Sequence, residues 1–153
     1  MKNLVIIGAG KNNTFIDGLN NGKCIFNITK RNVAVTIKGV TIRNGKSNSD
    51  YSAGAIVTSG KLNIIFSRFA NNTATGNFSG GAIYTNGILN LTNCEFTGNK
   101  VTNVNSQGGA IRCYNNATYI TSCNFNQNKV TGTNSTGGSC IYTESGDMIL
   151  NRT

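Results

Sequence analysis

The chain has 153 residues and a formal net charge of +9, from 14 lysines and arginines against 5 acidic residues, and it contains no histidine. The lack of histidine excludes serine–histidine and cysteine–histidine nucleophile systems and histidine metal sites. The basic residues are scattered along the sequence, and no aromatic-basic module of a nucleic-acid binder is present. We therefore expect the charge to serve mainly solubility, and we predict no nucleic-acid partner.

The first part of the chain predicts two irregular coils of short strands. Residues 4–18 (LVIIGAGKNNTFIDG) comprise an apolar strand, a glycine turn and a second strand. Gly8 and Gly10 follow a strand, but neither the third glycine nor a helical pattern comes next, so the dinucleotide-binding fingerprint fails and no cofactor is predicted. The strands of the second coil are predicted from alternating apolar and polar side chains at residues 24–28, 33–37 and 40–42.

From residue 53 onward the chain repeats itself. The unit at residues 80–99 (GGAIYTNGILNLTNCEFTGN) recurs at residues 53–72 and 108–128, and an incomplete copy starts at Gly137. The spacing is 27 residues from Gly54 to Gly81 and 28 from Gly81 to Gly109, which is typical of solenoids. Each unit has short runs with a period of two, which predicts strands that are stable only when successive repeats stack.

The sequence therefore predicts an all-β fold, a parallel β-helix (solenoid) with three short strands per coil of about 27–30 residues. Equivalent residues should lie one above another about 4.8 Å apart, and asparagines should stack as amide ladders. Polar segments at residues 46–52, 73–79, 100–107 and 129–136 should protrude as loops from one edge. The predicted core columns are Ile56, Ile83, Ile111 and Ile141; Val35, Leu62, Leu89 and Thr118; Ile37, Ile64, Leu91, Ile120 and Leu150; and Ile42, Phe69, Phe96 and Phe125.

We predict one β-helix segment over residues 1–153. Because the last repeat is incomplete and a solenoid needs capped ends, we expect this segment to belong to a longer surface protein. The apolar run at residues 4–7 is too short for a signal peptide or a membrane span, so no membrane span is predicted in the segment.

The five cysteines lack the spacing of a metal site, so we predict free thiols and no bound metal. Cys94 and Cys123 occupy equivalent positions in adjacent coils, where cysteine acts as a small buried hydrophobe. The distance between coils would also allow a disulfide, although an in-register stack seldom provides the required dihedral angle. The sequence leaves the redox state of this pair open.

Two repeated motifs carry a family resemblance. Gly-Gly-Ala-Ile occurs at residues 80–83 and 108–111, and Phe-x-x-Asn follows at residues 69–72, 96–99 and 125–128. This pairing resembles the repeat of the chlamydial polymorphic outer-membrane proteins, while IIGAGKNNTFIDG and IKGVTIRNG are similar to segments of adhesin-like surface proteins of methanogenic archaea. Either resemblance implies a right-handed, pectin-lyase-like β-helix at the cell surface or outside the cell. It does not by itself assign a function.

The acidic residues do not predict an active site. Polysaccharide lyases and glycoside hydrolases need grouped carboxylates, as an acid-base pair or as calcium ligands. Only Glu144 and Asp147 are close in sequence, and they flank a turn, where polar residues are expected. Glu95 is equivalent to Arg68 one coil earlier, which predicts a surface ion pair. We therefore predict no catalytic residue and no enzyme.

A binding surface has some support in the sequence. If the isoleucine column points inward, Tyr84, Arg112 and Tyr142 point outward along one stripe, headed by Val57. Two tyrosines beside an arginine suit sugar rings, hydroxyls and carboxylates. The alternative is that tyrosine is simply favoured on exposed strands.

Together these observations and the resemblance predict a non-enzymatic, adhesin-like segment that is a rigid stalk and contact surface for host or microbial surface glycans or proteins. The main alternative is a polysaccharide lyase or glycoside hydrolase of the pectin-lyase-like class, whose missing acids lie outside the segment. A passive spacer that binds nothing is the third interpretation.

Overall fold

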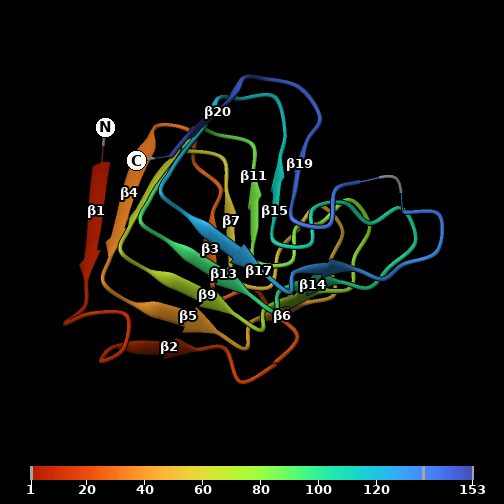
Figure 1. Cartoon of the computed structure of the whole chain (residues 1–153), viewed down its shortest axis with the longest axis horizontal. Coiled ribbons are helices and arrows are strands. Elements are labelled where there is room, and N and C mark those ends of the chain that lie inside the picture. The colour runs from red at the N-terminus through yellow and green to blue at the C-terminus, as the bar shows by residue number, and fades with distance from the viewer. Residues whose placement is uncertain (1, 136, 153) are drawn as a thin grey trace.

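The computed structural model describes residues 2–135 and 137–152, and within them the chain is an all-β solenoid without a helix. The strands wind through about five turns. Every strand pair among the described residues is parallel, and each strand pairs with its equivalent in the next coil (Figure 1). The predicted parallel β-helix is therefore confirmed. No helix in the described residues has the length and hydrophobicity of a membrane span.

Four parallel sheets form the walls of the solenoid. The six-stranded sheet contains β1 (Lys2–Ile7), β4 (Val33–Lys38), β8 (Lys61–Ile65), β12 (Leu89–Thr92), β16 (Thr118–Thr121) and β20 (Met148–Asn151). We call the next wall the phenylalanine sheet; it contains β2 (Phe15–Asp17), β5 (Thr41–Arg43), β9 (Arg68–Ala70), β13 (Glu95–Thr97) and β17 (Asn124–Asn126). The lysine sheet contains β6 (Lys46–Ser47), β10 (Thr73–Ala74), β14 (Lys100–Val101) and β18 (Lys129–Val130). The tyrosine sheet contains β3 (Phe26–Ile28), β7 (Ile56–Thr58), β11 (Ile83–Thr85), β15 (Ile111–Cys113) and β19 (Ile141–Thr143).

The lysine sheet is a wall that the sequence did not predict. Its strands are two residues long and lie at the start of the segments expected to be loops. An apolar or small side chain points inward at Ser47, Ala74 and Val101, all buried, and a polar one points outward. Two residues are too few for a period of two to be visible in a sequence. Each regular coil thus has four strands rather than three.

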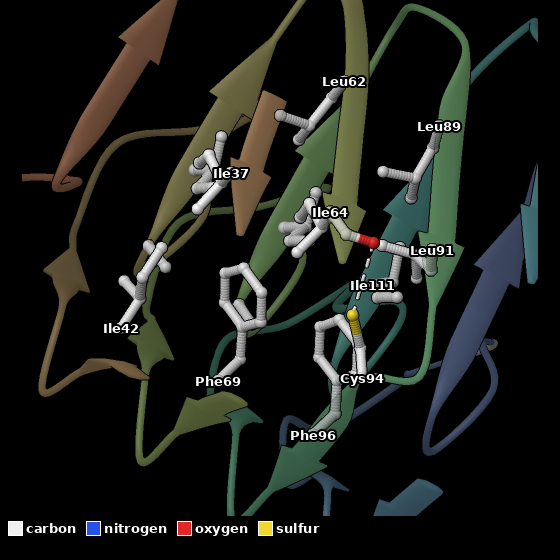
Figure 2. Close-up of a cluster of buried hydrophobic side chains, with 14 of the residues drawn as sticks. Ile37, Ile42, Leu62, Ile64, Phe69, Leu89, Leu91, Cys94, Phe96 and Ile111 are labelled. Atoms are coloured by element: carbon white, nitrogen blue, oxygen red, sulfur yellow. Dashed lines mark hydrogen bonds between the residues drawn. The ribbon is translucent and has the colours of Figure 1, made fainter. Parts of the chain in front are cut away.

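The core columns lie in the predicted register. Ile37, Ile64 and Phe96 are fully buried, and burying each such side chain is worth about 1.5–3 kcal/mol. Phe69 and Phe96 stack with ring centroids 4.8 Å apart and an interplanar angle of 4°. Figure 2 shows both side chains among the buried residues. The ring of Phe125 continues the stack at 4.9 Å. The interior is therefore a set of apolar columns along the solenoid axis.

A buried amide ladder runs beside the phenylalanine stack. Asn72 Nδ2 donates to Asn99 Oδ1 at 3.0 Å, and Asn99 Nδ2 donates to Asn128 Oδ1 at 2.9 Å. The same amides donate to the carbonyl oxygens of Ile42, Phe69 and Phe96 in the coil before their own. The ladder is made of the asparagines of the Phe-x-x-Asn motif, so that motif marks a turn whose buried polar groups are satisfied between coils.

All five cysteines carry free thiols. Cys94 lies in the core (Figure 2), and its backbone N–H donates to Cys123 Sγ at 3.4 Å. The side-chain hydrogen bond with Cys123, together with burial, raises the pKa of Cys94. The same bond lowers the pKa of Cys123. The thiols of Cys94 and Cys123 therefore interact through a hydrogen bond between adjacent coils.

Beyond the lysine sheet the connecting segments protrude together on one side of the solenoid, as predicted (Figure 1). They stack on one another through hydrogen bonds such as Tyr51 N–H to Asn77 O at 2.9 Å and Gly80 N–H to Ser52 O at 3.0 Å. Residue 136, the end of the fourth predicted loop, lies outside the described residues. The protruding loops form a wall next to the tyrosine sheet.

The amide ladder predicts a difference between two asparagines. Asn99→Ala leaves the buried amide of Asn72 and the carbonyl of Phe69 without their partner, and should lower the free energy of unfolding by about 3 kcal/mol. Asn63→Ala is the control, because Asn63 is half-buried on the outer face and bonds Thr36 and Asn90; it should cost about 1 kcal/mol or less. Urea unfolding of both variants measures this, and equal losses would contradict the role of the ladder.

Candidate functional site

The outer face of the tyrosine sheet brings the predicted stripe together. Tyr84 on β11 is in register with Val57 on β7 and with Arg112 on β15, and Arg112 is in register with Tyr142 on β19. The isoleucine column occupies the alternate positions and is buried inside, so these four side chains leave the opposite face of the sheet. Asn27 on β3 extends the stripe below Val57.

Arg112 lies at the centre of an aromatic cluster rather than on an open surface. Its side chain is 2% exposed, and it donates hydrogen bonds to the carbonyl of Phe78 and to the carboxylate of Glu144. Its Nε–H is buried without a hydrogen-bond partner in the described residues. The guanidinium carbon lies 5.4–6.0 Å from five ring centroids, those of Tyr51, Phe78, Tyr84, Tyr114 and Tyr142. Cation–π attraction and the hydrogen bond to the Phe78 carbonyl thus tie the sheet to the loop wall, while the bond to Glu144 joins Arg112 to the next coil.

The other two predicted residues are also partly covered. Tyr84 is 8% exposed, and burial raises the pKa of its phenol, with Arg112 acting in the opposite direction. Tyr142 is half-buried. The expectation that all three side chains lie open on a strand surface is therefore corrected for Tyr84 and Arg112, because aromatic rings from the loops cover them.

Tyr51 and Phe78 are the rings that cover the stripe, and sequence reasoning missed them. They occupy equivalent places in two successive loops, 27 residues apart. Both have left-handed backbones, with φ of 51° and 53°, a conformation that costs a residue with a side chain about 1–2 kcal/mol. Their rings stack with centroids 5.2 Å apart at 16°, and Tyr51 meets the edge of Tyr84 at 6.4 Å. The recurrence of an aromatic residue at the repeat spacing was the available signal.

Tyr51 is 55% exposed and forms one rim of a groove of about 500 Å³. The groove lies over β3 and β7, and polar groups of Asp50, Asn27, Thr29 and Lys23 line it. The Asp50 carboxylate also accepts a hydrogen bond from the backbone N–H of Asn77 at 2.7 Å, which fixes the loop. An immobilised aromatic ring beside a carboxylate, an amide, a hydroxyl and an ammonium group suits a sugar with its apolar face and its hydroxyls.

The carboxylates of Asp17, Glu95 and Glu144 are each held by cations. Glu95 accepts hydrogen bonds from Arg68 Nε at 2.6 Å and from Lys11, so the predicted ion pair with Arg68 is confirmed and Lys11 joins it. The hydrogen bond from Lys11, with that from Arg68, lowers the pKa of Glu95. The backbone N–H of Leu19, with the Arg43 side chain, lowers the pKa of Asp17. A general acid needs the opposite shift.

The acids also lie apart from one another. Asp17 on β2 and Glu95 on β13 are three strand steps apart in the phenylalanine sheet, about 14 Å at the usual strand spacing. Carboxylate pairs of glycoside hydrolases lie about 5–9.5 Å apart. Glu144, at the end of β19, is bound to Arg112. Among the described residues, no group of three or more acids and cysteines forms a metal site.

Comparison of the chain with protein-family models, curated proteins and solved structures found no match.

The Glu95 ion pairs predict a pH dependence of stability. Because the folded-state pKa of Glu95 lies below its ordinary value of 4.5, the carboxylate contributes stability above pH 4.5 that is lost as the pH falls through the folded-state pKa. Glu95→Gln should lower the free energy of unfolding at pH 7 by about 0.5–1 kcal/mol, and the difference from wild type should shrink below pH 4.5. Urea unfolding between pH 3 and 7 measures this.

Asp147→Asn is the matched control for the loss of one carboxylate. Asp147 is exposed and forms no ion pair in the described part of the chain. An equal effect of both substitutions at pH 7 would show that net charge, rather than the contacts of Glu95, controls the stability.

Proposed function

We propose that this β-solenoid is a non-enzymatic, adhesin-like segment of a cell-surface or extracellular protein, and that it is both a rigid stalk and a contact surface for glycans. The observation that carries the proposal is the groove rimmed by Tyr51, where an exposed ring fixed by its neighbours meets several polar groups. Glycan recognition commonly uses this combination, since a ring stacks on the sugar and polar groups orient its hydroxyls.

The interior supports the role of a stalk. Stacked phenylalanines, the asparagine ladder and backbone hydrogen bonds connect every regular coil to the next. In a solenoid each coil contacts only its neighbours, so resistance to bending depends on these contacts along the axis. A shaft held in this way keeps a lateral groove at a fixed height and orientation.

The aromatic cluster supports the contact surface. Tyr84 and Arg112 lie beneath the loop aromatics. Arg112 donates to the carbonyl of Phe78, and the ring of Phe78 stacks on that of Tyr51. A ring that is already immobilised loses little conformational entropy when a ligand stacks on it. Tyr84 and Arg112, two of the three residues predicted as ligand contacts, thus support Tyr51.

The alternative is a polysaccharide lyase or glycoside hydrolase of the pectin-lyase-like class. The ion pairs of Asp17 and Glu95 count against these two residues as acid catalysts, because a carboxylate held by a cation is a poor general acid. The alternative is tested in the same experiment as the proposal, by measuring shorter products as well as retention.

The test is a panel of neutral and acidic glycans, scored for retention of the purified protein and for release of shorter products. For the glycan retained most strongly, Tyr51→Ala should weaken binding about three- to tenfold, because it removes the stacking ring. Tyr119→Ala is the matched control, since Tyr119 is 42% exposed on the six-stranded sheet and away from the groove. The affinity of the Tyr119→Ala variant for the same glycan should stay within about twofold of that of wild type.

Three results would overturn the proposal. Equal losses in Tyr51→Ala and Tyr119→Ala would remove the groove as the site. Release of shorter products would favour the enzyme, and the absence of any retention would favour a spacer without a ligand.

A further inference from the structure

The fold gathers lysines that are far apart in the sequence into one line. Lys46 on β6, Thr73 on β10, Lys100 on β14 and Lys129 on β18 are successive partners in the lysine sheet. Their neighbours Ser47, Ala74 and Val101 are buried, so these four side chains point outward, and the three lysines are exposed. We call Lys46, Lys100 and Lys129 the lysine stripe.

Nothing in the described residues neutralises the lysine stripe. The four ion pairs there use Lys11, Arg43, Arg68 and Arg112. Lys100 and Lys129 face each other on neighbouring strands, where like charges destabilise a sheet. The backbones of these two lysines are one strand spacing apart, about 4.8 Å. An anionic partner would turn this repulsion into attraction.

A shallow hollow of about 340 Å³ lies between these two lysines, lined by Gly98, Lys100, Gln127 and Lys129. No carboxylate borders it. Gly98 and Gln127 have left-handed backbones, with φ of 64° and 55°, and they form the turn that leads into the lysine sheet. A Cβ on Gly98 would lie 2.6 Å from Asn71 Oδ1, so the glycine keeps this turn close-packed beside the hollow.

We propose that the lysine stripe binds an anionic polysaccharide. A carboxylate or sulfate group of the polymer occupies the hollow between Lys100 and Lys129, and the chain runs along the solenoid axis to Lys46, two strand steps further. The stripe is parallel to the axis, which suits a linear polymer with charges at regular intervals. This site lies on a different sheet from the groove of Tyr51, and its existence does not depend on that groove.

A glycan fits the stripe better than a single-stranded nucleic acid does. Nucleic-acid surfaces without sequence preference combine cations with aromatic rings on which bases stack. The strands of the lysine sheet contain only Lys, Ser, Thr, Ala and Val, and the hollow has no aromatic residue in its lining. Recognition here therefore depends on charge and spacing alone.

The test measures binding of the whole chain to heparin, which is sulfated, and to polygalacturonate, which is carboxylated, as a function of salt. Lys100→Gln combined with Lys129→Gln should weaken binding about tenfold or more and reduce the slope of log affinity against log salt by about 2. The control pair, Lys30→Gln with Lys61→Gln, removes the same charge from exposed lysines outside the stripe. It should weaken binding by less than about threefold. Whichever of the two polymers binds more tightly shows whether the lysine stripe prefers sulfate or carboxylate groups.

Equal losses in the two double variants would show that net charge is sufficient and would overturn the lysine stripe. Undiminished binding in Lys100→Gln, Lys129→Gln would also overturn it. Single-stranded DNA that binds as tightly as heparin, with the same loss in that variant, would reject a glycan as the specific partner. Tyr51→Ala should bind heparin as wild type does, which separates this site from the proposed groove.

Discussion

The constraint on which the whole structure depends is the in-register stacking of each residue on its equivalent in the next coil. Parallel strands one spacing apart place identical positions in direct contact, so a favourable self-contact is repeated along the axis. Phenylalanine stacks face to face, and asparagine amides form a ladder that satisfies buried donors and acceptors. The repeat is thus selected for residues that pack well against themselves.

The same constraint shapes the surface, where self-contacts are not all favourable. Glu95 is stacked on Arg68 and becomes part of an ion-pair cluster with Lys11. Lys100 is stacked on Lys129 without a compensating acid among the described residues. Small differences between repeats therefore decide the charge of each wall. The phenylalanine sheet carries ion pairs, whereas the lysine sheet is basic.

The loops add a second layer of organisation. Because the connecting segments leave every coil at the same corner, they stack into a wall (Figure 1). The rings of Tyr51 and Phe78 extend from this wall to Tyr84 and Arg112 of the tyrosine sheet. Arg112 is buried between strand and loop aromatics and binds a loop carbonyl. The outward-facing strand residues Tyr84 and Arg112 are therefore buried beneath the loop aromatics, and the exposed ring is that of Tyr51 in the loop.

The parallel β-helix, the register of the core columns and the pairing of Arg68 with Glu95 could be predicted from the amino-acid sequence, because each follows from residue type at a fixed repeat spacing. The burial of Arg112, the exposure of Tyr51 and the outward direction of Lys46, Lys100 and Lys129 became visible only in the folded chain. These depend on where the loops fold and on strands of two residues, which are too short to leave a period in the sequence. Periodicity encodes contacts between equivalent residues, whereas contacts between a loop and a sheet join residues that no repeat spacing relates.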